Sequence, residues 1–311
     1  MPTPSPLLAA LAPLALATAT LACSSDDHGV KDRAVAAAQD SAEDNATNAT
    51  DDATNEVDNT PTVGQADEDG WITMFNGEDL TGWTPKISGY ELGENPLNTF
   101  RVEDGKLVVA YDEYDNFEGR FGHLFYVGVD EEPAEFSHYI MQIEYRFTGD
   151  LVAGGPGWAV ENNGIMFHGQ PADTMGLDQD FPASIEAQML GDKNGPTGNV
   201  CTPGTHIHKD GELTHAHVIS FDGPRLPGNE WVTYELEVHG SQRAIHRING
   251  EVVADYGPFV LDPNDTACAG DAEAQRRGTT ELAYGTISLQ AEAAPVEFRN
   301  IRIKVLEEDA E

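Results

Sequence analysis

Basic residues, cysteines and nucleotide-binding motifs are scarce in this chain. Its 311 residues hold 17 Lys and Arg against 54 Asp and Glu, a formal net charge of −37. It has three cysteines, and it lacks a phosphate-cradling glycine loop, a nucleophile elbow and a basic patch. Such a surface repels nucleic acid and anionic membranes. The acidity suits either a cation-rich environment or solubility alone.

The chain also lacks an apolar run long enough to cross a membrane. The longest one, Leu7 to Leu21, is short and rich in alanine, which is typical of an export signal. It ends in Leu21-Ala22-Cys23-Ser24-Ser25, which resembles a bacterial lipoprotein cleavage site, although the preceding residues hold no Lys or Arg. We expect residues 1–23 to direct export and Cys23 to become the lipidated N-terminus of a cell-envelope lipoprotein. Plain secretion is the alternative.

Large apolar side chains are nearly absent from residues 24–70. This segment carries 13 Asp and Glu against Lys31 and Arg33, and it cannot bury enough apolar surface to offset the entropy lost on ordering. It is predicted to be a disordered acidic tether, and residues 307–311 form a short acidic tail. About −26 of the charge remains for residues 71–311, so the folded part is acidic too.

The sequence shows no pattern of a long amphipathic helix, and from Trp71 onward its pattern is typical of β-strands. Runs that alternate apolar and polar residues recur between turn residues, for example in 106–110, 138–147, 231–238, 286–290 and 296–305. Asp104-Gly105 and Asn249-Gly250 are typical hairpin turns. The pattern predicts an all-β fold, a two-sheet antiparallel β-sandwich over residues 71–306, with a β-bulge near Asn300, where the apolar phase slips.

Two polar-faced segments, 162–169 and 181–190, are predicted to be paired strands. Side chains alternate along a strand, so Ser184, Glu186 and Gln188 share one face while apolar residues fill the other. In the first strand, period two places His168 on the same face as Met166. If the strands pair, His168 could lie near Glu186, with a sugar-sized ligand across both.

Five motifs carry a resemblance to a known family. They are Met74-Phe75-Asn76-Gly77-Glu78-Asp79-Leu80-Thr81-Gly82-Trp83, Phe100 to Leu107, Asn162-Asn163-Gly164-Ile165, Pro182 to Leu190, and Gly285 to Gln290 followed by Val296 to Ile301. In this order they resemble the 3-keto-disaccharide hydrolases. The resemblance implies a concanavalin-like jelly roll that binds sugar on its concave sheet. The chain has His168 where the family often has Arg, and Ala291-Glu292 where it commonly has His-Gly.

The resemblance also implies a chemistry that needs one base. A ketone at C3 of the sugar acidifies the C2 proton, a base removes that proton, the enolate expels the C1 substituent, and water adds to the enone. Glu186 is the candidate base and His168 the candidate acid or enolate donor. Asn163, Gln188, Ser184 and Gln290 are candidate substrate-binding residues. The 184–188 strand supplies one carboxylate and one amide, so it does not by itself offer the carboxylate pair of glucanases.

Several further candidates have an equally plausible structural reading. Glu144 and Arg146 share a strand face that is either the sugar groove or a solvated surface, and Arg146 could simply pair with Glu186. Trp158 is either a sugar-stacking platform or a side chain held at the edge of the core. His206 and His208 are weak candidates for the ligands of a divalent metal, and the sequence indicates no other cofactor. In an exported protein, Cys201 and Cys268 could form a disulfide.

We therefore expect a glycan-active protein that cleaves 3-keto-glycosides or disaccharides by elimination and hydration. A non-catalytic carbohydrate-binding lipoprotein and a conventional endo-glucanase are the alternatives. The first activity would also require an oxidoreductase that supplies 3-keto sugars.

Overall fold

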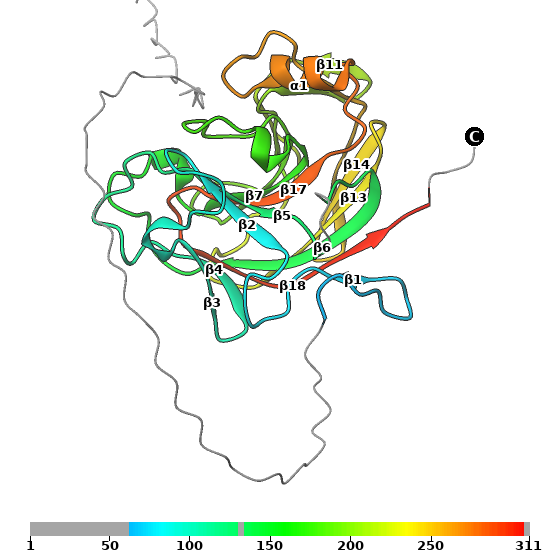
Figure 1. The fold of residues 1–311 in the computed structure, drawn as a ribbon. Helices are drawn as coiled ribbons and strands as arrows, with labels where there is room; N and C mark the ends of the chain where they lie inside the picture. The colour runs from blue at the N-terminus through cyan, green and yellow to red at the C-terminus, as the bar shows by residue number, and fades with distance from the viewer. Residues whose placement is uncertain (1–61, 130–133, 308–311) are drawn as a thin grey trace, which may run out of the picture.

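Two large antiparallel sheets packed face to face make up the domain (Figure 1). The computed structural model describes residues 62–129 and 134–307. The predicted export signal with Cys23, most of the predicted tether and residues 308–311 lie outside the described residues. The predicted all-β sandwich is confirmed.

The first sheet has eight strands. In spatial order they are β15 (Glu251–Tyr256), β14 (Arg243–Ile248), β13 (Val232–His239), β6 (His138–Phe147), β18 (Val296–Val305), β4 (Lys106–Val109) and β3 (Phe100–Glu103), with β1 (Ile72–Thr73) paired to β18.

The second sheet has seven strands and lies against the first. In spatial order they are β12 (Val218–Ile219), β9 (Val200–Cys201), β8 (Ile185–Leu190), β7 (Asn162–Gly169), β17 (Thr286–Ala291), β5 (Gly122–Tyr126) and β2 (Trp83–Ile87).

Smaller elements complete the described chain. A three-stranded sheet consists of β11 (Glu212–Thr214), β10 (Thr205–Lys209) and β16 (Phe259–Leu261), and the helices are η1 (Pro96–Asn98), η2 (Gly157–Ala159), η3 (Ala172–Thr174) and α1 (Gly270–Arg277). No helix in residues 62–129 or 134–307 is long and apolar enough to cross a membrane.

The core lies between the two large sheets because each strand turns its apolar side chains inward. In β6 burial alternates residue by residue, and Met141, Ile143 and Tyr145 are almost fully enclosed. In β8, Ile185 and Ala187 join the same core from the opposite sheet. The residues between them therefore point to the outer face of each sheet.

The predicted turns and bulge are present. Asp104 and Gly105 both have positive φ, as do Asn249 and Gly250, as a two-residue hairpin turn of this kind requires. Asn300 has φ 53°, and the register between β18 and β6 shifts between Arg299 and Arg302. The extra residue resets the alternation so that Phe298 and Ile301 both reach the core.

The packed domain begins before the predicted boundary at residue 71. Val63 is buried in the core, Gly64 donates a backbone hydrogen bond to the Thr73 carbonyl, and Ala66 bridges to Ile72. Residues 62–70 therefore add an edge to the first sheet instead of extending the tether up to Trp71.

The buried His246 predicts a dependence of stability on pH. Its ring lies between Tyr234 Oη (2.8 Å from Nδ1) and Tyr256 Oη (2.9 Å from Nε2), and burial lowers its pKa to about 4. The unfolded chain, with a His pKa near 6.5, binds more protons below that pH, so folding stability is lost as the pH falls from 6.5 toward 4.

Between pH 7 and pH 4, the free energy of unfolding should therefore fall by ~3 kcal/mol less in a His246→Gln variant than in the wild type. Urea unfolding at both pH values measures this difference. The control is His215→Gln, since that side chain is exposed. Equal acid destabilisation of the wild type and His246→Gln would contradict the prediction.

Candidate active site

A row of polar side chains crosses the outer face of the seven-stranded sheet. Gln290 of β17 lies opposite His123 of β5. On the other side of β17 lies β7, and β8 with Glu186 pairs with β7. Glu292 follows two residues after Gln290, just beyond β17. These residues alternate with core-facing Leu124, Ile185, Leu289 and Ala291, so they point away from the sandwich interior.

This outer face is not open surface. Glu186 is only 3 % exposed, Glu292 1 % and Gln290 0 %. Part of the cover is the segment 170–184, which includes η3 and lies on the side of α1 (Figure 1). Ala172 and Met175 of this segment pack on Phe125 of β5.

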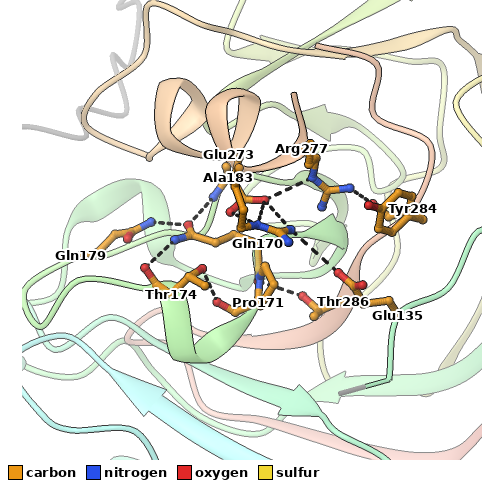
Figure 2. Close-up of polar contacts among 11 residues, drawn as sticks. Glu135, Gln170, Pro171, Thr174, Gln179, Ala183, Glu273, Arg277, Tyr284 and Thr286 are labelled. Atoms are coloured by element: carbon orange, nitrogen blue, oxygen red, sulfur yellow. Dashed lines mark hydrogen bonds and ion pairs between the residues drawn. The ribbon is translucent and has the colours of Figure 1, made fainter. Parts of the chain in front are cut away.

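One buried amide braces the covering segment. Gln170 Nε2 donates to the Thr174 carbonyl at 3.0 Å, and Gln170 Oε1 accepts from Gln179 Nε2 at 2.8 Å and from the Ala183 amide at 3.2 Å (Figure 2). The Thr286 hydroxyl donates to the Gln170 carbonyl and ties the segment to β17. The cover therefore has a defined conformation over the polar row.

Gly164 makes the centre of the row possible. An added Cβ at this position would lie 2.5 Å from Glu186 Cγ, 2.7 Å from Glu186 Oε1 and 2.9 Å from Gln290 Oε1. The glutamate thus leans across the bare β7 backbone toward Gln290. Only glycine leaves space for this approach.

Polar atoms on this face lack hydrogen-bond partners. Ten buried side-chain nitrogen or oxygen atoms in the described residues have none. Half of them lie here, on five neighbouring residues: His123 Nδ1, Glu186 Oε1, Ser288 Oγ, Gln290 Oε1 and Glu292 Oε2. Buried polar groups are normally satisfied, so such a concentration indicates a place for a polar ligand or water.

Burial perturbs both carboxyl groups of this face. Burial raises the pKa of Glu186 to about 7, and hydrogen bonding with Gln290 and Cys201 partly opposes the rise. Burial raises the pKa of Glu292 well above its usual range, and the charge of Glu186 raises it further. Gln290 Nε2 donates to Glu292 Oε1 at 3.1 Å. The pair can therefore hold a proton at neutral pH, as acid–base chemistry requires.

His123 presents a lone pair to the same face. Its Nε2 lies 2.9 Å from the Asp180 carbonyl, which can only accept, so Nε2 carries the hydrogen. Burial lowers the pKa of His123 to about 4. The ring is therefore neutral at physiological pH, and its buried, unpartnered Nδ1 can accept a hydrogen bond from a ligand.

Three residues predicted from the sequence lie on this face or at its edge. Glu186 and Gln290 are in the row, and Gln188 lies beside them, where its Nε2 donates to Asn162 Oδ1 at 3.1 Å. Ser184 lies just before β8, with its hydroxyl bonded to the Pro182 carbonyl. The predicted pairing of the 162–169 and 185–190 strands is present as β7 and β8.

His168 does not lie beside Glu186. It has φ 50°, and there two residues of β7 oppose one of β17, a β-bulge that resets the alternation. The ring packs on Phe259, and its Nε2 lies 2.8 Å from the carbonyl of Gly240, which follows β13 of the other sheet. The predicted shared face is therefore wrong, and His168 points between the sheets.

Asn163 also serves the backbone. Its Nδ2 donates to the Gln290 carbonyl at 2.8 Å, and its Oδ1 accepts from the Gly164 amide. It alternates with Gly164, so it lies on the opposite side of β7 from the polar row. The geometry gives it a role in holding β7 and β17 together.

Glu144 and Arg146 lie on the outer face of the other sheet. Glu144 accepts from Arg299 Nε at 2.8 Å, and Arg146 Nε donates to Glu297 at 2.8 Å. Both arginines flank Trp231, at 4.1 and 4.7 Å from the ring centroid. Glu144 and Arg146 also line a pocket on this face, together with Trp231 and Arg302. The pairing of Arg146 with Glu186 is wrong, because alternation does not reveal which sheet a strand joins.

Trp158 is held at the margin of the core. Its ring stacks parallel to Phe121 at 5.8 Å, and Phe121 contacts Phe181, which packs against His123. A row of aromatic rings thus runs from Trp158 to the polar face. Its stacking partner inside the protein favours the structural reading of this residue.

The predicted disulfide between Cys201 and Cys268 is wrong. Cys201 is a buried free thiol on β9, opposite Glu186 in the β8–β9 pairing. Burial raises the pKa of this thiol well above its usual range, and the charges of Glu186 and Glu292 add to the effect. The thiol therefore forms part of the wall beside the carboxyl pair.

The weak metal candidates lie in the small sheet. His206 Nε2 is 3.0 Å from His215 Nδ1 and 3.2 Å from Asp262 Oδ2, while His208 Nδ1 faces the Pro258 carbonyl. Within the described part of the chain, no group of three or more His, Cys, Asp or Glu side chains is arranged to hold a metal ion.

Sequence reasoning missed His123 and Glu292. Glu292 could have been found, because it follows Ser288 and Gln290 at a spacing of two residues and so shares their strand face. For His123 the sequence shows only that it alternates with apolar residues in a short run. Its place opposite Gln290 depends on the long-range β5–β17 pairing.

Comparison with known proteins identifies one family. A family model described as a 3-keto-alpha-glucoside-1,2-lyase-like domain matches residues 70–304. No curated protein matches the chain.

The solved structures that the chain resembles share little sequence with it. A glycosyl hydrolase candidate from Parabacteroides distasonis is 17% identical, with a TM-score of 0.44, and the match covers 77% of this chain and 95% of that one. The carbohydrate-binding module CBM66 from Bacillus subtilis is 13% identical, with a TM-score of 0.35 and coverage of 72% and 96%. A galectin-like protein of unknown function from Bacillus subtilis is 11% identical, with a TM-score of 0.37 and coverage of 73% and 90%.

A Gly164→Ala substitution should disturb the site more than the fold. The new methyl group would overlap Glu186 and force its side chain away from Gln290, whereas the β7 backbone can accept alanine. We expect a displaced Glu186 in a crystal structure of the variant and a loss of 1–3 kcal/mol in stability, as is usual for overpacking. Gly157→Ala is the matched control, because an added Cβ there meets open space. An unmoved Glu186 would contradict the prediction.

Proposed function

Because the chain belongs to the family of 3-keto-alpha-glucoside-1,2-lyase-like domains, we propose that it cleaves 3-keto-glycosides on the outer face of the seven-stranded sheet. The observation that carries this proposal is Glu186, a buried carboxyl with a pKa of about 7 among unpartnered polar atoms. A general base works best when its pKa lies near the operating pH.

The proposed reaction has two halves. Glu186 removes the C2 proton, the electron pair passes toward the C3 carbonyl as an enolate, and the enolate then expels the C1 alkoxide. Water adds across the resulting enone, with its oxygen on C1 and a proton on C2. The products are the free 3-keto sugar and the released alcohol, so the sum is a hydrolysis without net oxidation.

Neighbouring side chains would hold the substrate. The Gln188 and Gln290 amides can donate to and accept from sugar oxygens, and His123 Nδ1 can accept from a sugar hydroxyl. His123 thus supplies the imidazole of the site in place of His168. Because the free Nδ1 of His123 carries a lone pair and no hydrogen, His123 can bind the substrate or act as a base, but it cannot donate a hydrogen bond to the enolate.

The substrate requires a preceding oxidation. An ordinary sugar has a hydroxyl at C3, so an oxidoreductase would have to supply the ketone. We also propose that the protein is exported and anchored through Cys23, which agrees with the signal-like start of the chain.

A conventional endo-glucanase is the second candidate, and the carboxyl pair favours it. Glu186 and Glu292 are two buried carboxyl groups on one face, and the charge of Glu186 raises the pKa of Glu292. Glycosidases use a pair of carboxyl groups. A non-catalytic carbohydrate-binding protein could use the same face.

Paired substrates distinguish these functions. Incubating the protein with a 3-keto-glucoside and with its parent glucoside should release the alcohol from the keto sugar alone, because only that sugar has an acidic C2 proton. Turnover of the parent would instead support the glucanase, and binding of either sugar without turnover would support a carbohydrate-binding role.

Replacing the proposed base should abolish turnover. Glu186→Gln keeps the size of the side chain but removes the base, and kcat should fall by about 10²- to 10⁴-fold. Since the base acts unprotonated, wild-type kcat/KM should rise with pH, with a midpoint near 7. Glu144→Gln, on the far sheet, is the control and should retain activity. Full activity of Glu186→Gln would rule out the assignment.

A further inference from the structure

We infer that Glu292 is a second catalytic residue, the acid that protonates the departing C1 oxygen. The inference rests on the proposed function and assigns the half of the chemistry that Glu186 does not perform. It depends on how the hydrogen bonds of this one side chain are distributed.

The two oxygens of Glu292 have different surroundings. Oε1 accepts a hydrogen bond from Gln290 Nε2 at 3.1 Å, while Oε2 is buried without any partner. In a protonated carboxyl group, the carbonyl oxygen is the better acceptor and the hydroxyl oxygen carries the hydrogen. Gln290 therefore favours the proton on Oε2, the one oxygen that is free to donate to a ligand.

The charge of Glu186 favours the protonated form of Glu292. The charge of Glu292 in turn contributes to the raised pKa values of the Cys201 thiol and the Tyr111 hydroxyl. The Tyr111 hydroxyl accepts from the Ala293 amide. No cation of the described residues contributes to the pKa shift of Glu292, whose causes are burial and then the charge of Glu186.

The pair would keep one negative charge through the whole cycle. Glu186 gains a proton from C2 as Glu292 loses one to the leaving oxygen, so the charge passes from Glu186 to Glu292. In the hydration step, the Glu292 carboxylate takes a proton from the attacking water, and Glu186 returns its proton to C2. Both residues regain their starting states, and no change in net charge has to be solvated in a buried site.

The leaving group provides the test. The 4-nitrophenyl 3-keto-glucoside releases a stable phenolate that needs no acid, whereas the methyl 3-keto-glucoside releases an alkoxide that does. For Glu292→Gln, we expect kcat on the methyl glycoside to fall by about 10²-fold or more, and on the nitrophenyl glycoside by less than about tenfold. Unchanged thermal unfolding, with Glu144→Gln as the matched carboxylate control, would show that the fold is intact.

The outcomes separate the two proposals. Equal losses on both glycosides, or no loss on either, would overturn the donor role of Glu292 while leaving the elimination chemistry in place. A wild-type protein that is inactive on both keto sugars would instead overturn the proposed function itself. If Glu292→Gln does not fold, Glu292→Asp gives a second test, because a shortened acid should show the same dependence on the leaving group.

Discussion

Burial of two carboxyl groups on one face of a sheet is the constraint on which the site depends. A carboxylate away from water is costly unless it is paired, and no cation balances Glu186 or Glu292 among the described residues. The cost falls if one of the two groups keeps its proton. Such an arrangement contributes little to stability, so its presence is better explained by chemistry than by folding.

Rigid elements hold this costly arrangement in place. β7, β8 and β17 are central strands, paired on both sides, and Gly164 lets Glu186 approach Gln290 without moving either backbone. The covering segment is fixed independently. Lys86 Nζ donates to the carbonyls of Tyr90 and Leu177, both at 3.0 Å, while Gln170 braces the other end. Strand pairing and backbone hydrogen bonds thus stabilise the folded arrangement of the site, which the buried carboxyl groups destabilise.

Local sequence patterns predicted much of this architecture. Alternation predicted the outward faces of Glu186 and Gln188, and turn residues predicted the hairpins at Asp104 and Asn249. The bulge at Asn300 was visible because apolar residues on both sides of it revealed the slip in phase. The bulge at His168 was not, since a histidine is compatible with either face. Its φ of 50° is set by the register with β17, which lies more than a hundred residues away.

Long-range pairing decides the rest of the site. Alternation shows which residues of one strand share a face, but it does not show which sheet receives the strand or what lies opposite. For this reason Glu144 and Arg146 could be grouped correctly on one face, while the suggested pairing of Arg146 with Glu186 joined residues of two different sheets. For the same reason Glu292 could not be joined to Glu186 from the sequence. β7 lies between β8 and β17, and Gly164 leaves room for Glu186 to approach Gln290, which lies two residues before Glu292. The second carboxylate that the 184–188 strand lacks thus comes from a distant part of the chain.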